Sequence, residues 1–141
     1  MSTIVDKGNT ILLKGDIPPA GDTAPDFTYV TDTLQESSLY DITEGVKVIL
    51  AMPSLDTGTC STEMIRFDKE LAGKEGVYAL CMTMDLPFAM KRFCTTENIQ
   101  NVHVGSDYRY KDFMGEFNVE MVDGALKGLA SRAVFVIDAN N

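Results

Sequence analysis

The chain has 141 residues, of which 45% are hydrophobic and 23% are charged, and its formal net charge at pH 7 is -9. These values are ordinary for a globular protein, and the length predicts a single domain over residues 1–141. The excess of acidic residues argues against nucleic acids and membranes as partners, because phosphate-rich surfaces repel negative charge. The first residues show neither the basic start nor the apolar stretch of a signal peptide, and we expect a cytoplasmic protein.

The N-terminal part predicts a β-hairpin followed by short strands. Residues 3–5 and 10–13 alternate around a glycine-containing turn, Lys7-Gly8-Asn9, as the two strands of a hairpin do. A loop rich in proline and glycine follows at residues 15–21, and then a short strand at 27–30. Residues 46–52 are almost all apolar, which is typical of a strand buried on both faces, and Pro53 ends this run.

The rest of the chain alternates between helical and extended patterns. Apolar residues recur at helical spacing over 61–72, and shorter helices are predicted at 87–94 and 110–117. Strands are predicted at 77–84, 102–104 and 133–137. This order predicts an α/β fold built on parallel strand–helix–strand units. The last residues, 138–141, have turn chemistry with no strand after them, so we expect a domain truncated at its C-terminal end.

The most informative motif joins the buried strand to the long helix. Pro53, Thr57 and Cys60 form the pattern PxxxTxxC, which places Cys60 in the first turn of that helix. The unpaired N–H groups and the dipole at a helix start favour negative charge. Thiols in such positions ionise readily, and the thiolate is the reactive form. We therefore predict that Cys60 is a nucleophile rather than a buried apolar residue.

Three other residues are candidates for the same site. Thr57 lies one helical turn before Cys60 and can donate and accept hydrogen bonds, although it can also serve only as the helix cap. Pro53 has no N–H and can exclude water. Arg132 precedes the last strand and offers a permanent positive charge, although a surface salt bridge is the alternative for it. A thiolate with hydrogen-bond donors around it is suited to attack on a peroxide bond.

A second thiol would resolve the sulfenic acid that such an attack leaves on Cys60. The three cysteines do not form the even set of a secreted disulfide framework. Cys81 falls inside an apolar strand and is expected to pack in the core. Cys94 ends an amphipathic segment that we expect to be exposed and able to unwind, so it is the better candidate. The only histidine, His103, is not paired with Cys60 by any local pattern, and zinc-ligand spacing is absent from the sequence.

Three segments together resemble the bacterial thiol peroxidases, the atypical two-cysteine branch of the peroxiredoxin family: residues 53–60, 80–94 and 124–133. The resemblance covers nearly the whole chain. It implies a thioredoxin-like fold with an N-terminal β-hairpin, and we expect the family's final strand and C-terminal helix to be missing here. It also implies hydrogen peroxide and alkyl hydroperoxides as substrates, thioredoxin as reductant, no cofactor or metal, and a homodimer.

Position by position, the resemblance assigns roles to five residues. Cys60 matches the peroxidatic cysteine and Cys94 the resolving cysteine of an intramolecular disulfide. Pro53, Thr57 and Arg132 match the residues of the peroxide pocket. One alternative is a non-catalytic redox sensor that uses the same disulfide, and another is an inert fragment of a thioredoxin fold. Catalytic turnover separates the enzyme from the sensor, and a two-state thermal melt would argue against the inert fragment.

Overall fold

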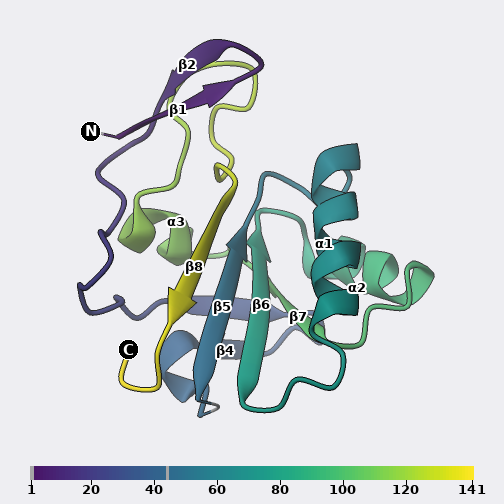
Figure 1. Cartoon of the computed structure of the whole chain (residues 1–141). Coiled ribbons are helices and arrows are strands. Elements are labelled where there is room, and N and C mark those ends of the chain that lie inside the picture. Colours follow the sequence, from purple (N-terminus) through teal and green to yellow (C-terminus); the bar gives the residue numbers. More distant parts are fainter. Residues whose placement is uncertain (1, 44) are drawn as a thin grey trace.

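The computed structural model describes residues 2–43 and 45–141. Its strands in chain order are β1 (Thr3–Asp6), β2 (Asn9–Leu12), β3 (Thr28–Thr31), β4 (Glu36–Ser38), β5 (Val46–Ala51), β6 (Val77–Thr83), β7 (Val102–Ser106) and β8 (Ala133–Ile137). The helices are α1 (Gly58–Glu70), α2 (Pro87–Thr96) and α3 (Asp112–Phe117), with a short 3-10 helix η1 (Leu39–Asp41). Figure 1 shows that these elements form one main sheet and a separate hairpin.

The main sheet has six strands in the order β4-β3-β7-β6-β5-β8. The strands β5, β6 and β7 are parallel, and α1 and α2 connect them. The outer strands are antiparallel, because β8 pairs with β5 and β3 pairs with β7. This arrangement confirms the predicted α/β class and the predicted parallel strand–helix–strand units. It also brings the carboxyl ends of β5 and β6 to the same edge, beside the start of α1.

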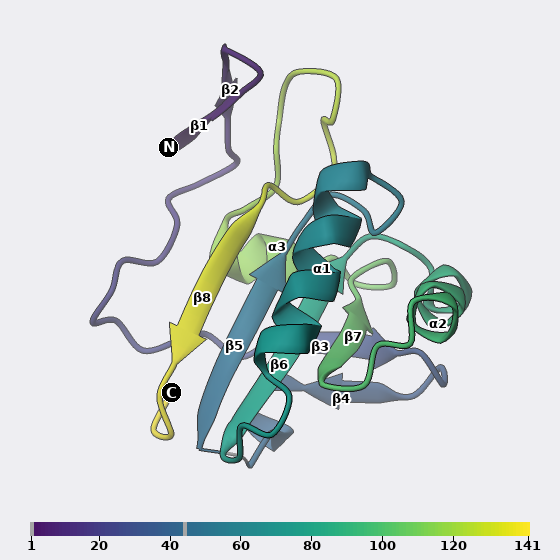
Figure 2. The same ribbon diagram turned by 45° about the vertical axis from the view of Figure 1, so that its right-hand side comes forward.

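Helices cover both faces of this sheet, α1 and α2 on one and α3 on the other (Figure 2). Successive strand residues point to opposite faces, so neighbouring residues of β5 enter different cores. Leu50 packs with Met64 of α1 and Met90 of α2. Ile49 packs with the α3 residues Phe113 and Phe117. Burial on both faces explains why β5 and β6 are almost continuously apolar.

The hairpin of β1 and β2 lies beyond the sheet, next to the loop that leads from α3 to β8 (Figure 1). An isolated bridge pairs Leu13 with Met121, and both side chains are buried together with Ile11. The backbone N–H of Leu12 donates to Asp123 Oδ1 at 2.9 Å. The hairpin therefore docks on the loop before β8 and supplies a wall above the start of α1.

The structure confirms the predicted helices and strands. Some of them begin or end at other residues than predicted, because a side-chain cap or a left-handed backbone conformation sets the boundary. The helix predicted from residue 61 begins at Gly58, because Thr57 caps it. The helix predicted from residue 110 begins at Asp112, because Lys111 has a left-handed φ of 52° that interrupts a helix. The strand β4 was not predicted, since it has three residues and none is strongly apolar. Within the described residues, no helix is long and apolar enough to cross a membrane.

Candidate active site

Cys60 lies in the first turn of α1, where the predicted motif places it. Thr57 is the N-cap residue, and its Oγ1 accepts a hydrogen bond from the Cys60 backbone N–H at 3.3 Å. The Thr57 hydroxyl in turn donates to the carbonyl oxygen of Ser54 at 3.1 Å. Thr57 therefore caps the helix, and it also holds its oxygen at the end of α1 that carries the sulfur.

The loop before α1 is fixed by a residue that the sequence analysis did not select. Asp85 follows β6 and accepts hydrogen bonds from the Ser54 hydroxyl at 2.7 Å and from the Leu55 N–H at 2.8 Å. The Thr83 hydroxyl donates to the same carboxylate at 2.9 Å. Asp85 thus ties the carboxyl end of β6 to the segment between β5 and α1. The signal that could have revealed it is its place just after a central strand, where α/β proteins collect polar site residues.

One cavity of about 950 Å³ brings four predicted residues together: it is lined by Pro53, Thr57, Cys60 and Arg132. Cys60 lines this cavity although the residue is only 1% exposed to solvent. The β1–β2 hairpin and the loop before β8 complete the lining with the apolar side chains Ile4, Ile11, Met121 and Leu126. The sequence analysis did not foresee this apolar wall, because it forms only when the hairpin docks.

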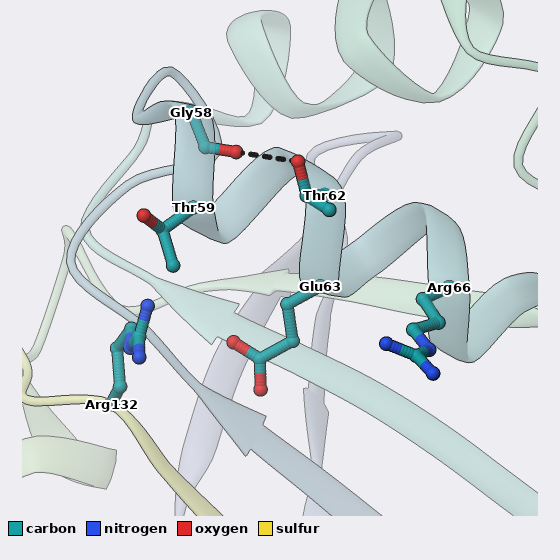
Figure 3. A pocket seen from close by; sticks show the side chains of 6 residues that line it. All are labelled: Gly58, Thr59, Thr62, Glu63, Arg66 and Arg132. Carbon is teal, nitrogen blue, oxygen red and sulfur yellow. Dashed lines mark hydrogen bonds between the residues drawn. The ribbon is translucent and has the colours of Figure 1, made fainter.

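Arg132 is exposed and borders a second, shallower hollow on the outer side of α1 (Figure 3). Figure 3 shows its guanidinium directed toward Thr59, with the Glu63 carboxylate between Arg132 and Arg66. Within residues 2–43 and 45–141, no hydrogen bond or ion pair engages the Arg132 guanidinium. Among these residues, Arg132 does not form the surface salt bridge that was the alternative for it. Its donors remain available beside the Cys60 cavity.

Cys94 lies in the last turn of α2 and opens to a different cavity, of about 370 Å³, between α2 and the β3–β7 edge. It is half-buried rather than exposed as expected. Burial raises the pKa of the Cys94 thiol to about 11, and the negative charges of Asp32 and Asp68 add to this effect. The thiols of Cys60 and Cys94 are both free. The structure does not bring these two residues into one cavity, although both pack against the core cluster under α1 and α2.

Cys81 and His103 lie outside the Cys60 cavity. Cys81 is fully buried in β6, as expected, and burial raises the pKa of its thiol well above the usual value, with the nearby Cys94 contributing next. His103 stacks on Tyr78 with ring centroids 4.1 Å apart and lines the Cys94 cavity, not the Cys60 cavity. In the part of the chain that the structure describes, no group of histidine, cysteine and acidic residues is arranged to hold a metal ion.

The chain is similar in sequence to a known protein family and to several thiol peroxidases. Residues 19–141 match the family model described as Redoxin. A thiol peroxidase of Leptospira interrogans is 46% identical over all of this chain and 84% of its own length. A thiol peroxidase of Aquifex aeolicus is 49% identical over 94% of this chain and 78% of its own length.

Solved structures agree in fold. The crystal structure of a peroxiredoxin-like protein from Aquifex aeolicus matches 98% of this chain and 80% of its own chain, with a TM-score of 0.92 and 47% identity. A thiol peroxidase from Chromobacterium violaceum matches with a TM-score of 0.88 at 23% identity, which supports the fold alone. The expected thioredoxin-like fold of peroxiredoxin type is confirmed. The chain belongs to the redoxin family, among the peroxiredoxin-type thiol peroxidases, and is a peroxidase enzyme.

Proposed function

We propose that the enzyme reduces hydrogen peroxide and alkyl hydroperoxides with Cys60 as nucleophile, Cys94 as resolving thiol and thioredoxin as reductant. The observation that carries this proposal is the cavity shared by Pro53, Thr57, Cys60 and Arg132. A thiol at a capped helix start, a guanidinium with no partner among the described residues, and a proline without an N–H meet there. The apolar hairpin side of the same cavity suits the carbon chain of an alkyl hydroperoxide.

In the first step the Cys60 thiolate attacks one oxygen of the peroxide. The S–O bond forms as the O–O bond breaks, and the other oxygen leaves as alkoxide or hydroxide and takes a proton to become alcohol or water. Sulfur is oxidised to sulfenic acid by the two electrons that the peroxide gains. Arg132 stabilises the charge that develops on the leaving oxygen. Thr57 fixes the helix start, and Pro53 limits the access of water.

In the second step the Cys94 sulfur attacks the Cys60 sulfenic acid, water leaves and an intramolecular disulfide forms. Because the two cysteines open to different cavities, this step requires α2 to unwind or shift. The start of α2 suits such a change, since its N-cap residue Leu86 makes no side-chain hydrogen bond to the helix. Thioredoxin then supplies two electrons by thiol–disulfide exchange.

The same proposal includes a cytoplasmic homodimer. Exposed apolar side chains support an interface at the start of α2, where Leu86 is 51% and Phe88 67% exposed. Adjacent exposed apolar residues of this kind often mark protein contacts. Sedimentation of the purified protein tests the dimer, and a concentration-independent monomer would contradict it.

Rapid mixing of the reduced enzyme with hydrogen peroxide tests the chemistry. The parent should consume about one equivalent in the first turnover and form the Cys60–Cys94 disulfide, as the sulfenic acid route requires. Cys94→Ser should consume peroxide at the parent rate but stop at a trappable sulfenic acid. Cys81→Ala is the matched control and should retain both steps. A Cys60→Ser protein that reacts as fast as the parent would refute the proposal.

A further inference from the structure

One buried hydroxyl at the edge of the cavity has no partner. Ser131 is 1% exposed, and in residues 2–43 and 45–141 its Oγ is the one buried side-chain polar atom without a hydrogen bond. Folded proteins pair almost all such atoms, because an unpaired buried hydroxyl loses its bonds to water and gains none in return. An exception in a residue that lines the same cavity as Cys60 suggests that the partner is a ligand.

The position of Ser131 is well fixed. Its backbone N–H donates to the carbonyl oxygen of Val119 at 2.8 Å, and the preceding residue, Ala130, is bridged to Glu120. Ser131 lines the same cavity as Cys60, Thr57 and Arg132. It is as deeply buried as Cys60, since each is 1% exposed. The backbone of Ser131 is thus held in place where this residue lines the cavity, and its hydroxyl remains unpaired.

Two hydrogen-bond donors beside the Cys60 sulfur already have partners within the protein. The Cys60 N–H is already bonded to Thr57 Oγ1, and the Thr57 hydroxyl proton is directed to the carbonyl of Ser54. Neither proton is available to a peroxide without breaking one of these bonds. Two donors on the lining of this cavity make no hydrogen bond within residues 2–43 and 45–141: the guanidinium of Arg132 and the hydroxyl of Ser131.

We propose that Ser131 is a further catalytic residue, whose hydroxyl donates a hydrogen bond to the peroxide oxygen that leaves when Cys60 attacks. This inference rests on the proposed function of Cys60. The leaving oxygen gains negative charge as the O–O bond breaks, and a donor positioned in advance stabilises that charge without reorganisation. The Ser131 proton stays on its own oxygen. The alkoxide or hydroxide takes its proton from solvent, so no net transfer passes through the serine.

Stopped-flow measurement of Cys60 oxidation by hydrogen peroxide in Ser131→Ala tests the proposal. Loss of one hydrogen bond to the developing charge should slow the second-order rate about tenfold. The rate of Cys60 alkylation by iodoacetamide, and its dependence on pH, should not change, because the alkylation does not use the leaving oxygen. Ser131→Thr keeps a hydroxyl and should retain more of the rate than Ser131→Ala. Ser37→Ala, in β4 far from the cavity, is the control and should match the parent in both reactions.

Thermal melting separates this role from a structural one. Ser106 is also 1% exposed, but its hydroxyl donates to the Asp85 carbonyl, so Ser106→Ala loses a buried bond and should melt at a lower temperature. Ser131→Ala loses no bond, and its melting temperature should stay the same or rise. The inference is overturned by a parent-like peroxide rate, by a parallel loss of alkylation, or by a melting loss like that of Ser106→Ala. A retained activity in Cys60→Ser would instead overturn the proposed function itself.

Discussion

The two helices that carry the cysteines of the proposed disulfide hold them in opposite ways. Cys60 lies in the first turn of α1, behind a side-chain cap from Thr57 and a loop tied to Asp85. Cys94 lies in the last turn of α2, a helix that begins without a side-chain cap. One thiol is therefore held in a fixed position, and the other sits on an element that has fewer ties at its start.

The two cysteines also differ in how their helix ends act on a negative charge. A helix start favours negative charge and a helix end disfavours it. Burial, together with Asp32 and Asp68, raises the pKa of Cys94 to about 11, so this thiol stays protonated at neutral pH. In the proposed mechanism, Cys60 is the thiol that attacks, and Cys94 stays unreactive until α2 moves.

The largest effect should come from the charge beside Cys60. Arg132→Ala removes the unpaired guanidinium, and the rate of Cys60 oxidation should fall about 100- to 1000-fold, as for the loss of a donor to a developing oxyanion. Arg132→Lys keeps the charge without the planar set of donors and should lose less. Arg66→Ala is the matched control, because Arg66 borders the outer hollow but not the Cys60 cavity. Equal losses in Arg66→Ala and Arg132→Ala would contradict a specific role for Arg132.

The next effect concerns the loop that holds Cys60. Asp85→Ala leaves the Leu55 N–H and two hydroxyl groups without their acceptor, and it should destabilise the fold by about 2–4 kcal/mol. The rate of Cys60 oxidation should fall about tenfold as the helix start loosens. Alkylation of Cys94 should not change, because its cavity lies elsewhere. Loss of reactivity at both cysteines would show that Asp85 acts through the whole fold.

The pH dependence of disulfide formation sharpens the comparison at Cys94. If α2 unwinds first, the exposed thiol has an ordinary pKa, and the rate should level off near pH ~8.5. If Cys94 reacted within the folded helix, the rate would keep rising toward pH 11, the region of its raised pKa. The raised pKa also means that burial of Cys94 stabilises the fold below pH ~8.5, and that this contribution is lost as the pH rises through about 11.

The smallest effect should come from the helix cap. Thr57→Val removes the oxygen that accepts from the Cys60 N–H, and the free energy of unfolding should fall by about 1 kcal/mol. Thr57→Ser keeps the hydroxyl and should remain close to the parent in denaturant titration. A Thr57→Val protein as stable as the parent would show that the hydrogen bond at 3.3 Å contributes nothing to the fold.

The sequence was most informative where the chemistry is local. The helix start at Cys60, the cap at Thr57 and the end of the buried strand at Pro53 depend on residues within one short segment, and the structure places them as predicted. The strands of the sheet were also predictable, because double burial leaves a nearly continuous apolar pattern. Arg132 was reachable through the rule that sites lie at strand ends, although its distance along the chain left a salt bridge as the alternative.

The remaining features arise from contacts between distant segments. Asp85 binds the loop before α1 across two strand ends, and the docked hairpin forms the apolar wall of the cavity. Cys94 was expected to be exposed, but packing of α2 against the core half-buries it. The unpaired hydroxyl of Ser131 could not be seen from the sequence, because only the folded chain shows which polar atoms lack a partner.

Site-resolved oxidation tests the central claim most directly. The reduced enzyme is mixed with less than one equivalent of hydrogen peroxide, quenched within milliseconds by a reagent specific for sulfenic acid, and digested for peptide mass spectrometry. The account predicts that the sulfenic acid label is on Cys60, with Cys94 and Cys81 unmodified at the earliest times. A first label on Cys94 or Cys81, or no difference between the parent and Cys60→Ser, would contradict it.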